Sequence, residues 1–406
     1  MSGARQCVIL VGGKGTRLGA LTKDTPKPLL PVGGRPFLSY LIQEAARHGS
    51  ERILLLAGFK AEAFANELDV LRAAVPAAVE LKVLAEPEPL GTGGALKFAA
   101  PHLDEHFLLL NGDSFFDINL LDLAAPPLPE ASVGRLALKP EVDVSRYGTV
   151  GLKGENVTTF AEKNSAGGPG LINGGIYWFN RSLLNHFGNG FVSLETEVLP
   201  KLAIAGRLLG KVYDRFMLDI GLPYSLEQAQ TSVPAQMRRP AVFLDRDGVI
   251  NRDVGYAHRP DQIVWVDGAL AAIKTFNDAG FYVFVVSNQA GVARGYYTEA
   301  DVMALHRWMA AQMAAAGAHA DAFAYCPFHP DGTVAAYAKA SPHRKPAPGM
   351  ILDLLKTWPV AKDQSFLIGD RAHDIEAAAA AGLPGYLFEG HDLSAFIESR
   401  IGMPAR

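Results

Sequence analysis

The amino-acid sequence predicts an α/β protein with two doubly wound domains, a Rossmann-like N-terminal domain and a second α/β domain after it. Short apolar runs alternate with amphipathic helical patterns, which is typical of parallel sheets covered on both faces. This alternation stops in a polar stretch with two prolines, at 229–240, and then starts again. At 406 residues, the chain is also too long for one ordinary hydrophobic core. We expect domains at 1–230 and 241–406, joined by a linker at 231–240.

In the first half, apolar runs predict buried strands at 7–11, 52–58, 79–86 and 107–111. A helical period in the intervening sequence predicts helices at 36–49 and 60–74. The sequence then becomes richer in glycine and β-favouring residues as far as about residue 180. A helical segment at 194–206 follows.

The second half shares this organisation but not its motifs. Strands are predicted at 241–245, 282–288, 322–326 and 365–369. Helices are predicted between and after them, at about 267–279, 299–316, 348–357 and 374–381. Strands that alternate with helices in this way indicate a doubly wound sheet.

The composition excludes several classes of protein. Hydrophobic residues make up 49% and charged residues 20% of the chain, as in soluble globular proteins. The formal net charge of −4 offers no basic field for nucleic acid. The two cysteines, Cys7 and Cys326, cannot form a disulfide framework, and no apolar run suits a signal peptide or a membrane span. We therefore expect a cytoplasmic protein without nucleic-acid or membrane partners.

A glycine-rich loop, "VGGKGTRL", follows the first predicted strand. Gly12, Gly13 and Gly15 let the backbone turn tightly and bring its N–H groups close to a polyphosphate, and the adjacent Thr16 is also expected to bind the substrate. Arg17 adds a fork of donors for phosphate oxygens, and Lys27 stands between two prolines that stiffen its backbone. By itself, the loop can equally be a tight strand–helix turn with a surface arginine.

Six further motifs follow in order, and the whole set resembles the sugar-1-phosphate nucleotidylyltransferases over about residues 5–230. The motifs are "EPEPLGTGGALK", "LNGDSFF", "FAEKN", "LINGGIYWF", "SLETEVLP" and "MLDIGLPYSLEQA". The resemblance implies transfer of a nucleotidyl group to a sugar 1-phosphate, with pyrophosphate as the leaving group. Arg17 is then expected to hold the pyrophosphate and Lys27 the α-phosphate.

The same resemblance implies the other site residues of this half. Asp113 and Asp219 are expected to bind Mg²⁺, and Glu162 and Lys163 to contact the sugar phosphate. Asn173, Gly174 and Glu195 are expected to hold the sugar hydroxyls. The loop that carries Glu86, Gly91 and Thr92 is expected to receive the nucleobase.

The nucleobase can be argued from hydrogen bonding. Guanine presents two adjacent donors on its Watson–Crick edge, and one carboxylate can accept both. Either Glu86 or Glu88 could supply that carboxylate, and either can equally be a solvated loop residue. The sequence thus favours GTP as the nucleoside triphosphate.

A second phosphate site is indicated by "FLDRDGVIN" at 243–251. Asp245 and Asp247 follow an apolar strand, and they would be the nucleophile and the acid–base group of a phosphate ester hydrolase. Alone, the pair can equally form an Asx turn. Three later motifs, "VVSNQAG", "HRKPAPGM" and "LIGDRAHDI", complete a resemblance to the haloacid-dehalogenase-like phosphatases.

That resemblance implies roles for residues of each later motif. Ser287 and Asn288 are expected to contact the phosphate, and Lys345, with Arg344 beside it, to offset its charge. Asp370 is expected to bind Mg²⁺ together with Asp245 and Asp247.

The closer resemblance, over about residues 241–390, is to the D-glycero-D-manno-heptose 1,7-bisphosphate phosphatases and, through them, to histidinol phosphatase. Those families commonly bind zinc through Cys-x-His followed by Cys-x-Cys. Here the four positions read Cys326, Phe328, Ser341 and His343, and His329 matches a position that is not a ligand. We therefore expect no zinc, and a loop held by packing of Phe328 and Tyr337.

Together, the two resemblances imply consecutive steps in the synthesis of a nucleotide-activated heptose, GDP-D-glycero-α-D-manno-heptose. Removal of the 7-phosphate from heptose 1,7-bisphosphate leaves the 1-phosphate that a guanylyltransferase activates. Two alternatives remain at this point. One is a hexose-1-phosphate transferase fused to a histidinol-phosphatase-like hydrolase. The other is a C-terminal domain that senses a sugar phosphate without hydrolysing it, against which the intact set of Asp245, Asp247, Lys345 and Asp370 argues.

Overall fold

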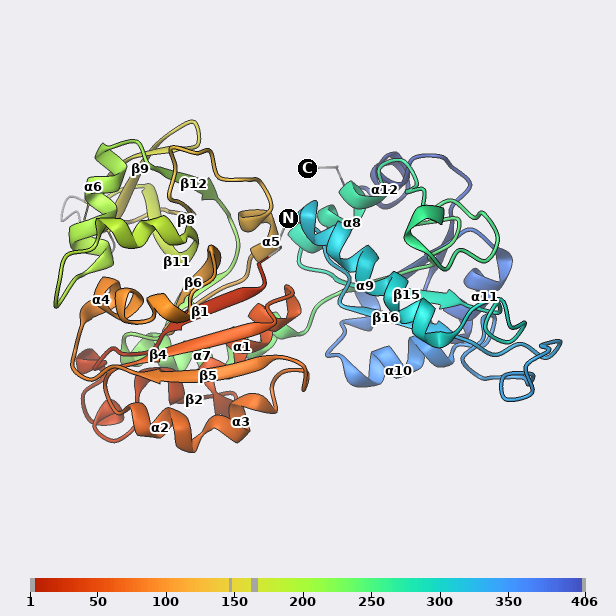
Figure 1. Cartoon of the computed structure of the whole chain (residues 1–406), viewed down its shortest axis with the longest axis horizontal. Helices are drawn as coiled ribbons and strands as arrows, with labels where there is room; N and C mark the ends of the chain where they lie inside the picture. Colours follow the sequence, from red (N-terminus) through yellow and green to blue (C-terminus); the bar gives the residue numbers. More distant parts are fainter. Residues whose placement is uncertain (1–3, 146–147, 162–166, 404–406) are drawn as a thin grey trace. The chain divides into compact units, whose positions relative to one another are not determined.

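The computed structural model describes residues 4–145, 148–161 and 167–403. The chain forms two compact units that meet in sequence after Gln236, and each unit is built around its own sheet (Figure 1). Within the described residues, no helix is long and apolar enough to cross a membrane.

The main sheet of the N-terminal unit has nine strands in the described part of the chain, in the order β5-β4-β1-β6-β11-β8-β12-β10-β9. The strands are β1 (Gln6–Leu10), β4 (Arg52–Ala57), β5 (Glu80–Ala85), β6 (His106–Asn111), β8 (Gly134–Glu141), β9 (Thr149–Lys153), β10 (Asn156–Ala161), β11 (Gly170–Asn180) and β12 (Leu208–Val212). The first four positions of the sheet are parallel, as the alternating pattern predicts. The long strand β11 is antiparallel to both β6 and β8, so the rest of the sheet is mixed.

Helices flank this sheet, and two small ribbons complete the unit. The helices are α1 (Phe37–Arg47), α2 (Ala61–Asn66), α3 (Leu68–Arg72), α4 (Gly91–Phe98), α5 (Leu120–Ala124), α6 (Leu199–Ile204) and α7 (Pro223–Met237). The ribbons pair β2 (Pro31–Val32) with β3 (Arg35–Pro36), and β7 (Ser114–Phe116) with β13 (Met217–Asp219). The helix predicted at 60–74 is divided at Glu67, whose backbone leaves the helical region.

The C-terminal unit has a five-stranded parallel sheet in the described residues, in the order β16-β15-β14-β17-β18. The strands are β14 (Ala241–Leu244), β15 (Tyr282–Asn288), β16 (Ala322–Cys326), β17 (Phe366–Gly369) and β18 (Gly385–Leu387). The helices are α8 (Ala269–Asp278), α9 (Glu299–Ala315), α10 (Gly349–Thr357), α11 (Ala372–Ala380) and α12 (Leu393–Ile401). Alternate residues of β14 enter different cores, Val242 and Leu244 on one side, Ala241 and Phe243 on the other. Burial on both faces explains why this strand is apolar throughout.

The segment 231–240, expected to be a linker, is helical as far as Met237. Tertiary packing explains the difference. The ring of Pro234 packs against Gly33, and the Gln230 amide donates to the carbonyl of Pro31 over 2.8 Å. Val233 is also fully buried. Contacts with the N-terminal unit therefore stabilise a helix that composition alone disfavours.

Candidate active sites

A cleft of about 670 Å³ opens in the N-terminal unit where the carboxyl ends of β1, β4 and β6 meet. Loops that follow parallel strands emerge at the same edge of the sheet, so residues distant in sequence converge there. The cleft is lined by the glycine-rich loop, by the loop at 86–92 that is expected to receive the nucleobase (the base loop), by the end of β6 and by residues of other segments. The lining includes Gly12, Gly13, Gly15, Lys27, Glu86, Glu88, Gly91, Thr92, Asn111, Asp113, Phe191 and Glu195.

Asp113 and Asp219 are brought together by the β7–β13 ribbon, in which Asp219 pairs with Ser114. Lys27 lies between the two carboxylates, with its ammonium 2.6 Å from Asp113 Oδ2 and 3.6 Å from Asp219 Oδ1. Burial and the charge of Asp113 raise the pKa of Asp219, because both disfavour a second negative charge. The lysine therefore holds together two acids that would otherwise repel each other.

The glycine-rich loop takes conformations that its small residues permit. Gly15 has a φ of 62°, and a Cβ on Gly12 would lie 3.0 Å from both the Glu86 carboxylate and the backbone N of Gly58. Thr16 and Arg17 are exposed and are not among the residues that line the cleft.

The base loop is held by two carboxylates, that of its own Glu86 and that of Glu195 from another segment. Glu86 accepts the N–H of Leu90 over 3.1 Å, and burial raises its pKa. Thr92 donates to Glu195 over 2.7 Å and accepts the N–H of Leu194 over 2.8 Å. Gly91 must be small, since a Cβ there would lie 2.5 Å from the carbonyl oxygen of Val192. Glu195 thus positions the loop in this structure.

Of the expected sugar contacts that the structure describes, Glu195 lines the cleft, whereas Asn173 and Gly174 do not. Asn173 and Gly174 lie on β11 outside the cleft lining, and Asn173 donates to the hydroxyl of Tyr177 over 2.6 Å. Glu162 and Lys163 lie outside the described residues. Sequence reasoning missed Asn111, which lines the cleft and whose Oδ1 is buried without a hydrogen-bond partner. Its position at the end of β6 was the available signal.

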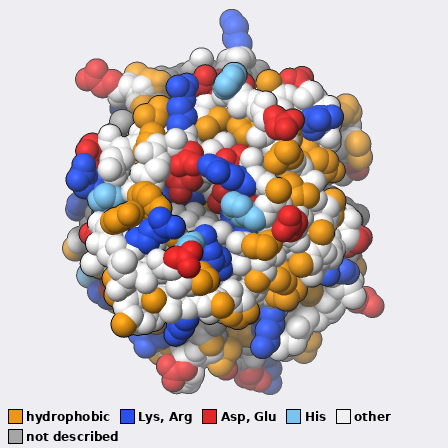
Figure 2. Space-filling model, turned by 90° about the vertical axis from the view of Figure 1, so that its right-hand side faces the viewer, with side chains coloured by type: hydrophobic (Ala, Val, Ile, Leu, Met, Phe, Trp, Pro, Cys, Tyr) orange, Lys and Arg blue, Asp and Glu red, His pale blue; other side chains and the backbone are white. Residues whose placement is uncertain are grey.

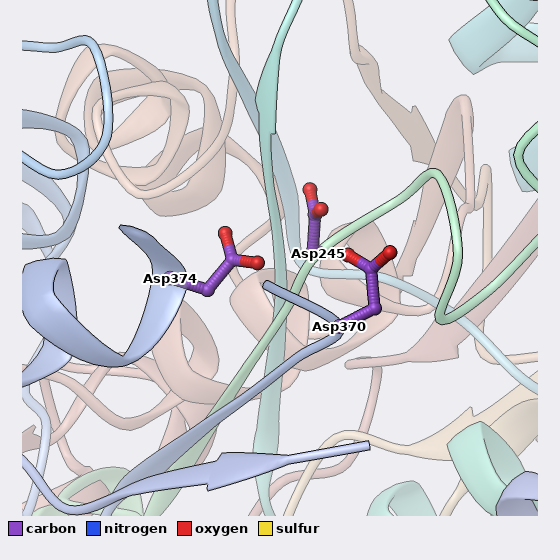
Figure 3. A group of neighbouring side chains, drawn as sticks. All are labelled: Asp245, Asp370 and Asp374. Atoms are coloured by element: carbon purple, nitrogen blue, oxygen red, sulfur yellow. The ribbon is translucent and has the colours of Figure 1, made fainter. Parts of the chain in front are cut away.

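Three carboxylates meet at the carboxyl edge of the C-terminal sheet (Figure 3). Asp245 follows β14, Asp370 follows β17, and Asp374 lies in the first turn of α11. Each carboxylate offers one oxygen within 4.8 Å of the oxygens of the other two. Among the described residues, these three acids form a group that could hold a metal ion. Burial and the charge of Asp374 raise the pKa of Asp370, while Oδ1 of Asp370 is buried without a partner. Asp374, rather than the expected Asp247, completes this group.

Lys345 occupies the centre of the site. Its ammonium lies 2.7 Å from Asp245 Oδ1 and 2.6 Å from Asp374 Oδ1, and it donates to the carbonyl of Val286 over 2.8 Å. Burial opposes the charge of Lys345, but the two carboxylates outweigh that effect and raise its pKa. Burial likewise raises the pKa of Asp245, against the pull of the lysine.

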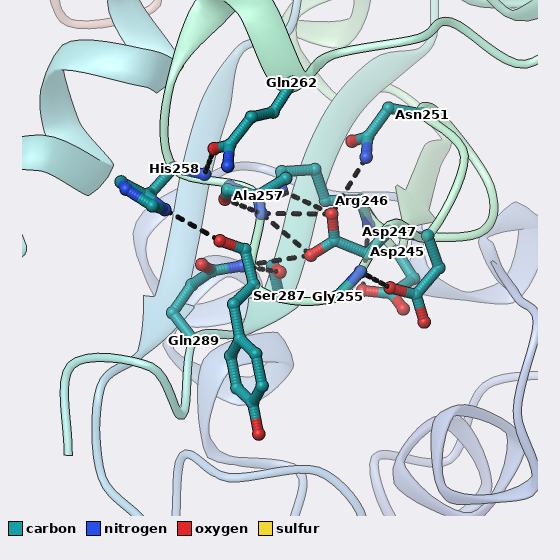
Figure 4. A network of polar contacts seen from close by, with 12 residues as sticks. Asp245, Arg246, Asp247, Asn251, Gly255, Ala257, His258, Gln262, Ser287 and Gln289 are labelled. Carbon is teal, nitrogen blue, oxygen red and sulfur yellow. Dashed lines mark hydrogen bonds and ion pairs between the residues drawn. The ribbon is translucent and has the colours of Figure 1, made fainter. Parts of the chain in front are cut away.

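The remaining expected residues support this centre indirectly. Asn288 exchanges two hydrogen bonds of 3.1 Å with the backbone of Lys345, and Ser287 accepts from Gln289 over 2.8 Å. Asp247 turns toward Arg246, Asn251 and Gln289 (Figure 4). Arg344 is half-buried. On the face shown in Figure 2, basic, acidic and histidine side chains gather around a hollow.

The positions of the altered zinc loop each have protein partners. Cys326 is fully buried, and the His343 ring lies 2.8 Å from the Asp353 carboxylate. The rings of Phe328 and Tyr337 are in contact, with centroids 5.7 Å apart, and Tyr337 donates to Glu299 over 2.7 Å. Ring packing and a hydrogen bond to the half-buried carboxylate of Glu299 therefore hold this loop.

Comparisons with known proteins match the two units separately. Residues 6–236 match the nucleotidyl transferase family, and residues 342–390 match the HAD-hydrolase-like family. The chain is 55% identical over 161 residues to the D-glycero-β-D-manno-heptose-1,7-bisphosphate 7-phosphatase of Rhodopseudomonas palustris, covering 40% of this chain and 89% of that protein.

The N-terminal unit has relatives of its own. It is 34% identical over 222 residues to the D-glycero-α-D-manno-heptose 1-phosphate guanylyltransferase of Campylobacter jejuni, covering 54% of this chain and 95% of that protein. The crystal structure of HddC from Yersinia pseudotuberculosis is 29% identical, with 56% of this chain and 99% of that one covered and a TM-score of 0.49.

The position of Lys345 predicts a stability difference between the two sites. Lys345→Met should lower the free energy of unfolding by about 3 kcal/mol, because it leaves two buried carboxylates without a counter-charge. Lys27→Met should cost less, since the side chains of Asp113 and Asp219 are 36% and 43% exposed. Urea unfolding followed by tryptophan fluorescence measures both changes. Adding Asp374→Asn to Lys345→Met should restore part of the loss, and equal losses for the two lysine variants would contradict this reading.

Proposed function

Because the chain belongs to the nucleotidyl transferase family over residues 6–236, and through its C-terminal unit to the haloacid-dehalogenase-like hydrolases, we propose that it is a bifunctional enzyme of nucleotide-activated heptose synthesis. Its C-terminal unit removes the 7-phosphate of D-glycero-D-manno-heptose 1,7-bisphosphate. Its N-terminal unit transfers GMP from GTP to the heptose 1-phosphate that remains.

One observation carries this proposal. One relative is named as a heptose-1,7-bisphosphate 7-phosphatase, and loss of the 7-phosphate leaves a heptose 1-phosphate. The other relative is named as a heptose 1-phosphate guanylyltransferase, so it uses that kind of molecule. Both units of this chain also place the charged side chains that phosphate chemistry needs at the carboxyl edge of their sheets.

In the transferase reaction, an oxygen of the sugar phosphate attacks the α-phosphorus of GTP, and the bond to the β-phosphate oxygen breaks. Negative charge develops on nonbridging and leaving oxygens, so positioned cations and N–H groups accelerate the step. Lys27 and the loop around Gly15 lie at the cleft for this purpose. We assign Arg17 to the departing pyrophosphate and Lys163 to the incoming sugar phosphate. Glu86 or Glu88 would accept the two guanine donors.

In the phosphatase reaction, a carboxylate oxygen of Asp245 attacks the 7-phosphorus and forms an aspartyl-phosphate. The bond to the C7 oxygen breaks, and Asp247 gives that oxygen a proton. Water then attacks the phosphorus, Asp247 takes its proton, and inorganic phosphate leaves with Asp245 restored. Lys345 offsets the charge of the aspartate and the phosphate throughout.

Both sites fit Mg²⁺ by the chemistry of their donors. Carboxylate oxygens are its preferred protein ligands, and the buried, partnerless Oδ1 of Asp370 would be satisfied by an ion. We propose Asp113 and Asp219 as ligands in the N-terminal unit, and Asp245 and Asp370 in the C-terminal unit. The bound ion would reduce repulsion between the carboxylates and the phosphate dianion.

The names of the two relatives differ in the anomeric configuration of the sugar. The phosphatase is named for a β sugar and the transferase for an α sugar. Hydrolysis at C7 leaves the bond at C1 untouched. Consecutive reactions in this chain therefore require the phosphatase unit to accept the α anomer. We expect the α-1,7-bisphosphate to be hydrolysed at least as efficiently as the β anomer, as measured by phosphate release. If the phosphatase unit hydrolyses only the β anomer, the two reactions are not consecutive steps in this chain.

Single-site variants should divide the two activities. Asp245→Asn should fail to make nucleotide sugar from the bisphosphate and GTP, yet make it at a near-normal rate from heptose 1-phosphate. Asp113→Asn should release phosphate from the bisphosphate and stop at the 1-phosphate, because an amide is a poor Mg²⁺ ligand. Anion-exchange chromatography of the products measures both outcomes.

Two exposed acids provide matched controls for these variants. Asp24→Asn and Asp363→Asn, whose carboxylates are 86% and 72% exposed, should leave both activities intact. If Asp245→Asn also loses activity on heptose 1-phosphate, the two units are coupled and their independence is refuted.

A further inference from the structure

Arg246, which stands between the two aspartates of the phosphatase motif, is fully buried at 0% exposure. A buried guanidinium is costly unless it is paired and hydrogen-bonded. Its Nη2 lies 3.0 Å from Oδ1 and 2.8 Å from Oδ2 of Asp247, and its Nε lies 3.3 Å from Oδ1 (Figure 4). The arginine therefore binds both oxygens of a single carboxylate.

Two amides complete the environment of Asp247. Asn251 donates to Oδ1 over 2.9 Å, and Gln289 donates to Oδ2 over 3.2 Å. The Gln289 amide is itself oriented, because its oxygen accepts from the Tyr297 hydroxyl over 2.8 Å. The Asp247 side chain remains 23% exposed, so one side of the carboxylate stays open.

Other contacts hold the Arg246 guanidinium on the side away from Asp247. It donates to the carbonyl of Ala257 over 2.8 Å, and its Nη1 lies 3.5 Å from Nε2 of His306. Burial and the charge of Arg246 lower the pKa of His306 to about 3, so the ring is neutral at physiological pH and adds no competing charge. The ring of His306 also stacks on Phe323, with centroids 4.8 Å apart. Among the described residues, the guanidinium thus has one carboxylate partner, and its other contacts leave it little freedom to move away.

We propose that Arg246 is a positioning residue that holds the Asp247 carboxylate where it gives and takes the protons of phosphate ester hydrolysis. This inference rests on the proposed phosphatase function. Asp247 serves both half-reactions, so a carboxylate held by a rigid fork stays in reach of the leaving oxygen and then of the attacking water. Asn251 and Gln289 alone, as neutral donors, hold it less firmly.

A substrate with a good leaving group separates this role from a general loss of structure. The 4-nitrophenolate released from 4-nitrophenyl phosphate needs no proton, so formation of the aspartyl-phosphate is independent of Asp247. Attack of water on that intermediate still needs the base. A misplaced Asp247 therefore lets the first half-reaction proceed and delays the second.

The experiment compares Arg246→Met with wild type in rapid-mixing assays on 4-nitrophenyl phosphate. We expect a burst of nitrophenolate close to one per site, larger than that of wild type, followed by turnover reduced about 10- to 100-fold with little change in KM. Asp247→Asn should show the same burst. Arg259→Met, which removes an exposed arginine paired with Asp261, should behave as wild type.

Transferase activity of the same chain and circular dichroism report whether Arg246→Met folds. If Arg246→Met does not fold, Arg246→Lys tests the positioning role instead. A single ammonium keeps the charge but cannot bind both Asp247 oxygens equally. Arg246→Lys should also show a burst of nitrophenolate, with a smaller amplitude than that of Arg246→Met. Steady turnover within twofold of wild type, faster turnover, or loss of turnover without a burst in a folded variant would each overturn the positioning role. If wild type hydrolyses no phosphate ester, the phosphatase function itself is wrong.

Discussion

A lysine ammonium held between two carboxylates is the interaction on which both candidate sites depend. Lys27 joins Asp113 to Asp219 in the first unit, and Lys345 joins Asp245 to Asp374 in the second. Acids gathered closely enough to bind a cation repel one another, and burial strengthens that repulsion. The lysine reduces this repulsion without contacting every carboxylate oxygen, so each site keeps the negative charge that the proposed Mg²⁺ would require. The two lysines differ in burial, since Lys345 lies in the interior and Lys27 lies at the edge of an open cleft.

The parallel sheets explain why these groups meet. A side chain placed just after a parallel strand emerges at the same edge as those after its neighbours, so residues more than a hundred positions apart converge. Asp245 and Asp370 follow adjacent strands, β14 and β17. In the first unit, Asp113 follows the parallel strand β6, and the short β7–β13 ribbon carries Asp219 to it. A separate antiparallel ribbon therefore completes the acid pair of this site.

Much of this arrangement is visible in the sequence because buried parallel strands are apolar throughout and their ends carry the chemistry. Strand β15 lies where its apolar run predicts it, and Asp113, Asp245 and Asp370 stand at strand ends as expected. What the sequence left open depends on side-chain direction. Nothing in "DRDG" says that Arg246 folds back onto Asp247, or that Asp374 rather than Asp247 joins the acid group. The helical course of 231–237 likewise depends on contacts of Gln230 and Pro234 that a local pattern cannot contain.

By the function proposed above, one chain carries out two consecutive reactions on one sugar. Phosphorus NMR of the intact protein with Mg²⁺, GTP and the α-1,7-bisphosphate follows every product at once. We expect inorganic phosphate to appear first, and pyrophosphate and the nucleotide sugar then to rise together until all three reach equal amounts. Phosphate release that is never followed by pyrophosphate, or pyrophosphate formed while the 7-phosphate is still attached, would contradict it.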